Sequence, residues 1–342
     1  MKKISLLGLF FLLGVYACGG SDHNNGNLAG GNVSIPSGGN YPEGIGIDAD
    51  GHVWVANQYS NTVVEFNQNG SIQNTFTVGA RPHGVKIDRG NTGNIWVQNT
   101  AGGGPGAPGS CPNNTTGTMT ALNPDGSLIG TFCTSGNQPQ HAQFDSSGNV
   151  WVTNQASNTV AELDGTGTFI NLFPTGVNPH AITSDQSGNF WIGNYGSASV
   201  TVLDPSGATL ATIPNAGQQP TGNSIDLAGN LWQSIEGNDV VSVFAGAPIF
   251  TFLMSEPVGV DPRGVSIDKA GNVFVANRVS NNVFKFDSSG NHVATYNVGG
   301  CPENMAVDSS GNVWVTNSCS STLNVIKGVA VGSSTGDSDS NG

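Results

Sequence analysis

The decapeptide DSSGNVWVTN occupies residues 145–154 and returns without a change at residues 308–317. Chance does not repeat ten letters, and a catalytic site is seldom needed twice. An identical stretch at two distant places is typical of a repeated structural unit. The two copies are 163 positions apart, which should therefore be a whole number of repeats.

Seven prolines mark the starts of equivalent segments. Their spacings are 40, 57, 40, 41, 42 and 40 positions, and the residues are Pro42, Pro82, Pro139, Pro179, Pro220, Pro262 and Pro302. The twin decapeptides thus lie four repeats apart. The one long spacing comes from an insertion, AGGGPGAPGSCPNNTTG, at residues 101–117.

Each repeat has the same internal order. An aspartate follows the proline by six positions, then comes a glycine-containing turn, and then an aromatic residue. The aromatic column contains every tryptophan of the chain and one phenylalanine: Trp54, Trp96, Trp151, Trp191, Trp232, Phe274 and Trp314. We expect these rings to pack between neighbouring sheets, and the aspartate side chains to cap the turns.

Short alternating apolar stretches predict four strands in each unit of about 40 residues, and no stretch has a helical period. Four strands with this repeat length are typical of a β-propeller blade. The sequence therefore predicts an all-β, seven-bladed β-propeller with four-stranded antiparallel blades over residues 32–327. The last repeat has only three strands, so we expect residues 32–35 to supply the fourth and close the ring.

The chain begins MKKISLLGLFFLLGVYAC. Two lysines precede an apolar segment that is too short to span a bilayer comfortably, which predicts a signal peptide at residues 1–17. The end of this segment resembles the lipobox of bacterial lipoproteins. The resemblance implies that Cys18 becomes a lipidated first residue that anchors the protein to the cell envelope, at the outer membrane, in the periplasm or at the cell surface. The alternative is a plain secretory signal, which also exports the chain.

The flanks and the composition agree with an exported β protein. Residues 18–31 and 328–342 are rich in Gly, Ser, Asn and Asp, and we predict a flexible tether and a disordered tail. Removing residues 1–17 takes away two lysines and no acid, so the formal charge falls from −13 to −15. Such a surface repels nucleic acid, and we expect a monomer.

Four cysteines remain after Cys18, namely Cys111, Cys133, Cys301 and Cys319. In an oxidising compartment they predict two disulfides with three possible connectivities. Alternating strand direction places the members of the first pair on one face of blade two and those of the second pair on the same face of blade seven. A Cys111–Cys133 bridge would pin the insertion over the mouth of the propeller, and a Cys301–Cys319 bridge would brace the closing blade.

The residues directly after the seven prolines should form the inner rim of that mouth: Glu43, His83, Gln140, His180, Thr221, Arg263 and Glu303. His141 lies one place further on. Three of the six histidines thus fall at this rim, which favours a ligand-binding or catalytic role. The alternative is a solvated rim, because two Pro-His pairs can descend from one ancestral repeat. An asparagine column near the same face, interrupted by Ile235, is explained by backbone capping.

The pattern P-x-G-I-x-x-D…G-x-x-W-V-x-N…N-x-V resembles the NHL-repeat propellers and the streptogramin lyase (virginiamycin B lyase) group over residues 33–327. In those lyases, mouth histidines work with a glutamate-bound magnesium ion to open a lactone by elimination. The resemblance implies that His180, in PHAIT, is the general acid/base candidate. The family's W-F-T-E appears here as WIGN at residues 191–194, so Glu236 is the nearest glutamate able to hold Mg²⁺ or another divalent cation.

Two hypotheses follow. The first is a membrane-anchored extracytoplasmic propeller that binds a protein, a glycan or a small ligand at the face carrying the insertion. The second is a metal-dependent carbon–oxygen lyase, or a hydrolase acting on lactones, that uses His83, His141 and His180. The incomplete catalytic set favours the first hypothesis.

Overall fold

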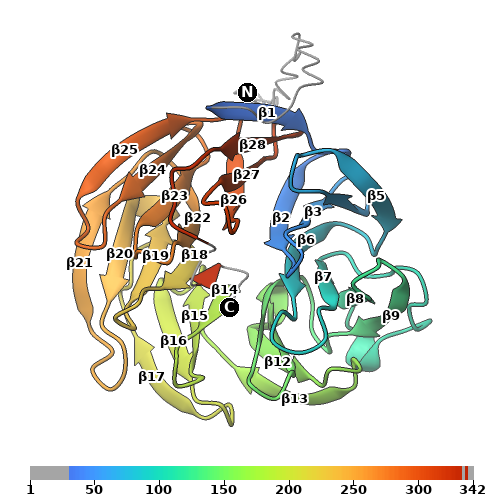
Figure 1. The fold of residues 1–342 in the computed structure, drawn as a ribbon. Coiled ribbons are helices and arrows are strands. Elements are labelled where there is room, and N and C mark those ends of the chain that lie inside the picture. The colour runs from blue at the N-terminus through green and yellow to red at the C-terminus, as the bar shows by residue number, and fades with distance from the viewer. Residues whose placement is uncertain (1–30, 333–335, 338–342) are drawn as a thin grey trace, which may run out of the picture.

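Seven antiparallel sheets surround a central axis in the computed structural model, which describes residues 31–332 and 336–337 (Figure 1). The predicted seven-bladed β-propeller is confirmed. The signal peptide, Cys18 and all but the last residue of the predicted tether lie outside the described residues.

Blades one to six are each built from four strands that are consecutive in the sequence. Blade one has β2 (Pro42–Ile47), β3 (Val53–Asn57), β4 (Thr62–Phe66) and β5 (Ile72–Thr77). Blade two has β6 (Pro82–Ile87), β7 (Ile95–Asn99), β8 (Thr118–Leu122) and β9 (Leu128–Cys133). Blade three has β10 (Pro139–Phe144), β11 (Val150–Asn154), β12 (Thr159–Leu163) and β13 (Phe169–Pro174).

The remaining blades follow the same order. Blade four has β14 (Pro179–Ser184), β15 (Phe190–Asn194), β16 (Ser199–Leu203) and β17 (Thr209–Ile213). Blade five has β18 (Pro220–Ile225), β19 (Leu231–Ile235), β20 (Val240–Phe244) and β21 (Phe252–Pro257). Blade six has β22 (Pro262–Ile267), β23 (Val273–Asn277), β24 (Asn282–Phe286) and β25 (His292–Asn297). The short 3₁₀ turns are η1 (Pro112–Asn114), η2 (Gln155–Ser157) and η3 (Glu236–Asn238).

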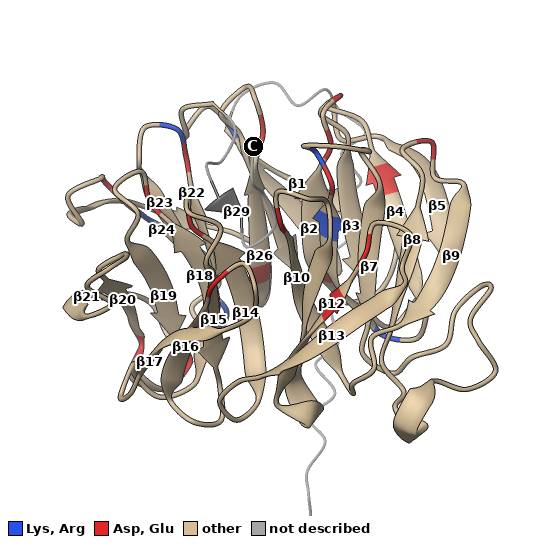
Figure 2. Ribbon diagram, turned by 90° about the horizontal axis from the view of Figure 1, so that it is seen from below, with Lys and Arg blue, Asp and Glu red and all other residues tan. Residues whose placement is uncertain are grey.

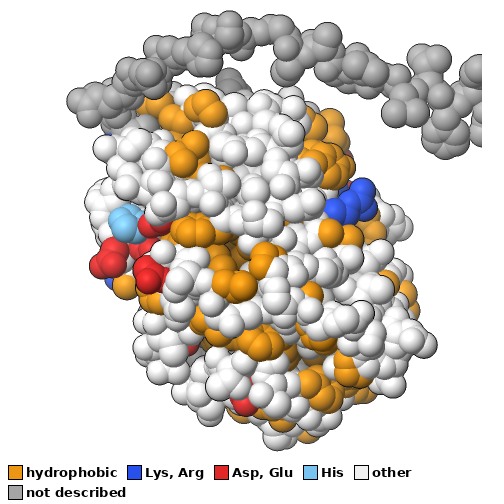
Figure 3. Space-filling view, turned by 90° about the vertical axis from the view of Figure 1, so that its right-hand side faces the viewer, with side chains coloured by type: hydrophobic (Ala, Val, Ile, Leu, Met, Phe, Trp, Pro, Cys, Tyr) orange, Lys and Arg blue, Asp and Glu red, His pale blue; other side chains and the backbone are white. Residues whose placement is uncertain are grey.

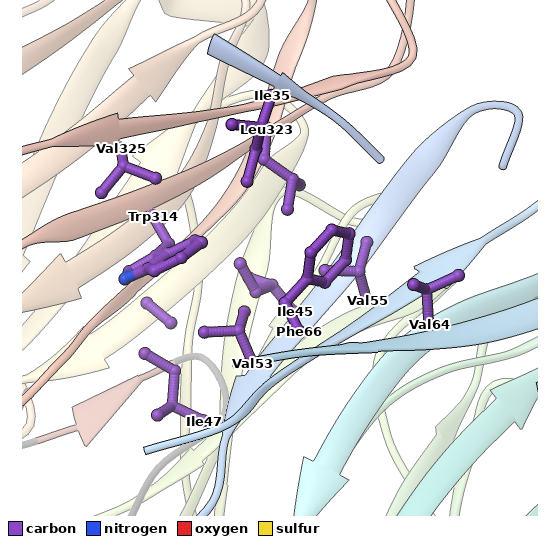
Figure 4. Close-up of a cluster of buried hydrophobic side chains, with 11 residues drawn as sticks. Ile35, Ile45, Ile47, Val53, Val55, Val64, Phe66, Trp314, Leu323 and Val325 are labelled. Carbon is purple, nitrogen blue, oxygen red and sulfur yellow. The ribbon is translucent and has the colours of Figure 1, made fainter. Parts of the chain in front are cut away.

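Blade seven joins the two ends of the propeller. Its three C-terminal strands are β26 (Pro302–Val307), β27 (Val313–Asn317) and β28 (Thr322–Ile326), and its outer strand is β1 (Asn32–Pro36). Val33 lies opposite Val325, and Ile35 lies opposite Leu323. Figure 4 shows Ile35 and Leu323 in the apolar cluster between blades seven and one. The predicted closure is confirmed.

The aromatic column forms the core between blades, as predicted. Each of its seven side chains is at most 2% exposed. In five blades the indole N–H also donates to the aspartate of the same repeat, over 2.9 to 3.3 Å. The other carboxylate oxygen accepts backbone N–H groups of the turn, as Asp48 does from Asp50 and His52. The aspartate column therefore caps the turns, as predicted.

Blade six departs from this pattern because Phe274 has no indole N–H. There the Asp268 carboxylate accepts the backbone N–H of Val331 over 2.8 Å. Val329 packs against the apolar cluster between blades six and seven, and β29 (Gly336–Asp337) pairs with β22 near the centre of the ring in Figure 1. Residues 328–332 and 336–337 of the predicted tail thus lie against blade six, next to the Asp268 carboxylate and the edge of β22, and the rest of that tail lies outside the described residues.

Both predicted disulfides are present, with Cα–Cα distances of 5.6 Å for Cys111–Cys133 and 5.2 Å for Cys301–Cys319. The insertion nevertheless does not cover the mouth. The Thr118 hydroxyl donates to the carbonyl of Gly103 over 2.8 Å, and the Thr131 hydroxyl to that of Pro105 over 2.7 Å. These threonines hold the insertion along β8 and β9, the outer strands of blade two.

The outside of the propeller has few charges. Lysine, arginine, aspartate and glutamate are scattered over the ribbon in Figure 2, and the side shown in Figure 3 is mostly uncharged, with apolar side chains between polar ones. Among residues 31–332 and 336–337, no helix has the length and apolar character needed to cross a membrane.

Candidate functional site

A cavity of about 140 Å³ lies at the mouth, the end of the axis where the inner strands begin with proline. We call it the mouth cavity. All seven blades contribute residues to its wall: Tyr41, Glu43, His83, His141, His180, Thr221, Gly222, Arg263, Gly264, Arg278, Glu303 and Asn304.

Close contact between inner strands explains the small residues at this level. A Cβ atom on Gly44 would lie 2.3 Å from the carbonyl oxygen of His83, so no larger side chain fits without movement. Blades three and seven carry His141 and Asn304 at this position instead. His141 Nδ1 lies 3.3 Å from the carbonyl oxygen of His180, and Asn304 donates to the carbonyl of Glu43 over 3.3 Å.

Three imidazoles from adjacent blades meet at the cavity. The ring centres of His83 and His141 are 5.1 Å apart, those of His141 and His180 are 5.0 Å apart, and those of His83 and His180 are 5.6 Å apart. Each ring keeps one buried nitrogen with no hydrogen-bond partner among the described residues: Nδ1 of His83, Nε2 of His141 and Nδ1 of His180. The predicted histidines thus form one cluster.

These imidazoles are neutral at pH 7. Burial, reinforced by the positive charge of Arg263, lowers the pKa of His83 from 6.5 to about 4. Burial and the neighbouring imidazole of His83 lower the pKa of His141 to about 3. The pKa of His180 falls well below its usual value for the same reasons. The backbone of Gln140 acts against this on His83, and that of Thr221 on His180, so each raises the pKa of its imidazole.

Two arginines form the opposite wall and are both paired. Arg278 donates to Glu303 over 2.8 Å, to Asp261 over 3.2 Å and to the Tyr41 hydroxyl over 3.2 Å. Nε of Arg263 lies 2.9 Å from Oδ1 of Asp261, where the two groups form an ion pair without the geometry of a hydrogen bond. Its second carboxylate partner is Glu236, at 3.1 Å.

Glu43 lies between the histidines and this charged wall. Its Oε2 accepts a hydrogen bond from Gln58 over 2.8 Å and lies 3.4 Å from Nε2 of His83. Burial raises the pKa of Glu43 to about 8, although Arg263 and Arg278 act against this. Burial and the Glu43 charge raise the pKa of Glu303 to about 7. Carboxyl groups that change charge near pH 7 beside neutral imidazoles can donate and accept protons.

Of the residues predicted for the rim, all but Gln140 line the cavity, and Glu236, predicted as a metal ligand, does not line it. The side chain of Gln140 turns back to the carbonyl of Gln138 over 3.3 Å and does not line the cavity. Glu236 is engaged by Arg263 and is not part of the cavity wall. The roles of the individual side chains stay predictions.

Sequence reasoning missed Tyr41, Arg278 and Asn304, as well as Gly222 and Gly264. A positional signal was available for the first three. Tyr41 directly precedes the first proline, Arg278 directly follows the asparagine column, and Asn304 is two places after the last proline. Each therefore belongs to a mouth segment identified from the repeat.

Magnesium, which the resemblance to the lyases implies, does not fit the residues present. Within the described part of the chain, no group of three or more His, Cys, Asp or Glu side chains is placed to hold a metal ion. Mg²⁺ requires oxygen ligands, whereas the carboxylate of Glu236 pairs with Arg263 and the cluster offers imidazole nitrogens.

Comparison with known proteins gives likeness in structure alone. No family model matches the chain, and no curated protein matches its sequence. A solved streptogramin B lyase is 16% identical, with a TM-score of 0.71 over 88% of this chain and 95% of the other. This chain has a streptogramin lyase-like β-propeller.

Two further structures give the same result. A catalytically inactive variant of virginiamycin B lyase from Staphylococcus aureus, solved with quinupristin, is 13% identical, with a TM-score of 0.74 over 86% of this chain and 98% of the other. Hydrazine synthase of Kuenenia stuttgartiensis is also 13% identical, with a TM-score of 0.72 over 91% of this chain and all of the other. Identities this low establish the fold and leave the chemistry to the side chains of the site.

Proposed function

We propose that this protein is a membrane-anchored, extracytoplasmic β-propeller that binds a small polar ligand in the mouth cavity, on the face that also carries residues 101–117. The observation that carries the proposal is the cluster of three imidazoles, each with a buried nitrogen that lacks a partner among the described residues. Leaving a buried polar atom unsatisfied costs about 1–3 kcal/mol. A ligand that bonds to these nitrogens would recover that free energy.

The size of the cavity supports a small ligand over a protein or a glycan. Its volume of about 140 Å³ is below the roughly 300–1,000 Å³ typical of pockets for drug-sized molecules. The insertion adds no residue to its wall, because it is held along β8 and β9. A protein or glycan partner would need a broader surface than this cavity.

The charges of the cavity support a neutral or cationic ligand. Both guanidinium groups contact carboxylates. The three imidazoles are uncharged at pH 7 because burial lowers their pKa values. An anion would gain little from these guanidinium groups, because they already pair with Glu236, Asp261 and Glu303.

Ligand retention tests the proposal. The purified chain is immobilised, exposed to an extract of the native envelope and washed, and the retained small molecules are identified by mass spectrometry. We expect a compound that His180→Ala no longer retains, while His292→Ala retains it, because His292 is an exposed histidine of β25. Equal retention by wild type and His180→Ala would refute binding at the mouth cavity.

Lipid anchoring is tested separately. The two disulfides indicate an oxidising, extracytoplasmic compartment, and the VYAC segment supports a lipid on Cys18. Cells that express the chain would be labelled with a radioactive fatty acid. We expect label in the wild type and none in Cys18→Ala. An unlabelled wild-type protein that is still exported would support the plain secretory signal instead.

A lyase or hydrolase is the second candidate, favoured by the Glu43–His83 contact of 3.4 Å. Because the pKa of Glu43 is raised to about 8, this carboxyl could act as a general acid while a neutral imidazole acts as the base. Quinupristin is a suitable first substrate. Ring opening by elimination leaves its mass unchanged, whereas hydrolysis adds one water, so chromatography with mass detection separates the two reactions. An intact macrocycle after incubation would count against activity of this type on this substrate.

A further inference from the structure

We propose that the mouth cavity binds its ligand through a protonated primary amino group, which lies beside the Glu43 carboxylate and donates hydrogen bonds to acceptors of the cavity wall. This assignment deepens the proposed function and rests on it for the existence of a ligand. The chemical class of that ligand is then a small organic ammonium ion. The assignment stands on the balance of charges at the mouth, the contacts of Glu43 and the hydrogen-bonding atoms left without a partner within the described residues.

The carboxyl groups at the mouth outnumber the guanidinium groups that pair with them. Four carboxyl groups and two guanidinium groups lie in the cavity wall or directly behind it: Glu43, Glu236, Asp261, Glu303, Arg263 and Arg278. The other titratable or charged groups that face them are His83, His141, His180, Tyr41 and Tyr195, with Arg81 and Lys86 further away. If all four carboxyl groups are ionised, two of their negative charges have no guanidinium group to match them. A cationic ligand would supply positive charge here.

Glu43 is the carboxyl group that lacks a cation. The two guanidinium groups pair with the other three carboxylates. Glu43 is only 8% exposed, and within the described residues it forms no ion pair with a lysine or an arginine. Its contacts are the amide of Gln58 at 2.8 Å and the neutral imidazole of His83 at 3.4 Å. Burying a carboxylate without a cation is costly, and burial accordingly raises the pKa of Glu43 to about 8.

The hydrogen-bonding atoms left over are acceptors. His141 is 2% exposed and lines the cavity, and its Nδ1 lies 3.3 Å from the carbonyl oxygen of His180. Because a carbonyl only accepts, Nδ1 carries the proton and Nε2 presents a lone pair. This Nε2 is buried and has no partner among the residues that the structure describes. Arg278, by contrast, already donates to two carboxylates and to the Tyr41 hydroxyl. A ligand must therefore donate hydrogen bonds, and an ammonium group has three donors and no acceptor.

An organic cation fits these acceptors better than a metal ion does. In the described part of the chain, no group of three or more His, Cys, Asp or Glu side chains is placed to hold a metal ion. The three N–H bonds of an ammonium group point in different directions, so they can reach acceptors that do not converge on one point. The cavity of about 140 Å³ admits the amino group and a short chain, and the rest of a larger molecule would extend out of the mouth.

Calorimetric titration with matched probes tests the ligand class. The purified chain is titrated with n-butylamine, n-butanol, butyrate and tetramethylammonium in about 0.15 M salt, which screens weak attraction to the negative surface. We expect one butylamine per chain and no binding of the alcohol or the carboxylate. Tetramethylammonium has no N–H group and should bind at least about tenfold more weakly. Binding of butylamine and butanol with equal affinity would overturn the proposal.

The pH dependence of butylamine binding tests the part played by Glu43. Butylamine stays protonated up to about pH 10, whereas Glu43 must lose its proton to pair with it. Affinity should therefore rise between pH 6 and pH 8, by up to about tenfold per pH unit for each proton released. Calorimetry in buffers of different ionisation enthalpy measures this proton release directly. An affinity that stays constant from pH 6 to pH 8 would contradict pairing with Glu43.

Glu43→Gln keeps the size of the side chain and removes its charge. At pH 8 it should bind butylamine about 10- to 100-fold more weakly than the wild type. The control is Glu256→Gln on the outer strand β21, which should bind like the wild type. Circular dichroism shows whether each variant folds. Undiminished binding by Glu43→Gln, or no butylamine binding by the wild type, would overturn the proposal.

The two proposals for the mouth cavity fail in different ways. If butylamine does not bind but an envelope compound is retained in a manner that depends on His180, the ammonium class is wrong and the proposed function stands. If butylamine binds beside Glu43 and wild type and His180→Ala retain the same compounds, the ammonium site stands and the proposed function is wrong.

Discussion

The two ends of the inner strands differ in how regular they are. At one end, all seven repeats carry an aspartate, and its carboxylate is bonded by its own turn and, in five blades, by the tryptophan of the same repeat. At the mouth end, the seven residues after the prolines include two glutamates, two histidines, a glutamine, a threonine and an arginine. The side chains at the first end are thus the same in every blade, whereas those at the mouth differ from blade to blade.

This contrast separates the side chains that the fold explains from the candidates for a function. The aspartate carboxylates have their bonds supplied within each repeat, so the fold itself explains them. At the mouth, carboxyl groups and imidazoles from different blades lie close together. Burial raises the pKa values of Glu43 and Glu303, and three ring nitrogens have no hydrogen-bond partner within residues 31–332 and 336–337. Retaining such groups lowers stability, which is expected where binding or catalysis requires them.

The largest effect on stability is expected for Trp151→Ala, which we compare with His180→Ala at the mouth. Trp151 stacks between Phe173 and Phe190, with ring centres 4.7 and 4.3 Å away. Its loss should lower the free energy of unfolding by about 3–5 kcal/mol, because it leaves a cavity. His180→Ala should change it by about 1 kcal/mol or less, because Nδ1 of this imidazole has no hydrogen-bond partner in the described part of the chain. Urea unfolding measures both, and equal losses would break the contrast.

The disulfides show how the irregular end is held. The Cys301–Cys319 bridge closes a loop with a sequence separation of 18 next to Ser318, whose hydroxyl donates to Glu303 over 2.9 Å. We expect Cys301→Ala/Cys319→Ala to lower the free energy of unfolding by about 3 kcal/mol. Thermal or urea unfolding tests this, with Cys111→Ala/Cys133→Ala as the control for a bridge far from Glu303. Only the first variant should also change ligand retention.

The regular end is the part that the sequence predicts well. The aspartate column recurs in all seven repeats and tryptophan fills the aromatic column in six of them, so each position is read from several copies. The strand β1 follows from the missing strand of the last repeat. The two disulfides follow from strand direction. These predictions depend on features shared by all blades.

Single occurrences were harder to predict. The insertion lies along the outer strands because Thr118 and Thr131 bond to its carbonyls, and no other blade offers that comparison. Val331 donates its backbone N–H to the Asp268 carboxylate, which receives no indole N–H because this repeat has Phe274. Arg278 and Tyr41 join the site through a hydrogen bond between blades, which no repeat pattern encodes.

The mouth should also show its own pH dependence through Glu43. Its pKa rises from 4.5 in the unfolded chain to about 8 on burial. The protonated carboxyl therefore stabilises the fold fully below pH 4.5, and this contribution is lost as the pH rises through 8. Relative to Glu43→Gln, the wild type should become less stable between pH 7 and 9.

The histidines do not titrate between pH 7 and 9. Because their pKa values are lowered, the stability contributed by the neutral imidazoles falls only as the pH drops from 6.5 toward 4 and below. Glu303, with a pKa of about 7, also titrates near this window and keeps its proton less tightly once the Glu43 charge is removed. Urea unfolding at several pH values measures the difference. A difference that does not change with pH would show that Glu43 is ionised in the folded protein.

The smallest expected effect tests whether the indole–aspartate bond matters beyond packing. Trp314→Phe removes the N–H that Asp308 accepts over 2.9 Å and makes blade seven resemble blade six. We expect a loss of about 1 kcal/mol in urea unfolding. Trp96→Phe is the matched control and should lose less, because the Asp88 carboxylate accepts the Thr92 hydroxyl over 2.8 Å in place of an indole. Equal losses of unfolding free energy in the two variants would mean that the size of the ring, and not the hydrogen bond, explains why tryptophan recurs in this column. Packing alone would then account for the regular end of the strands.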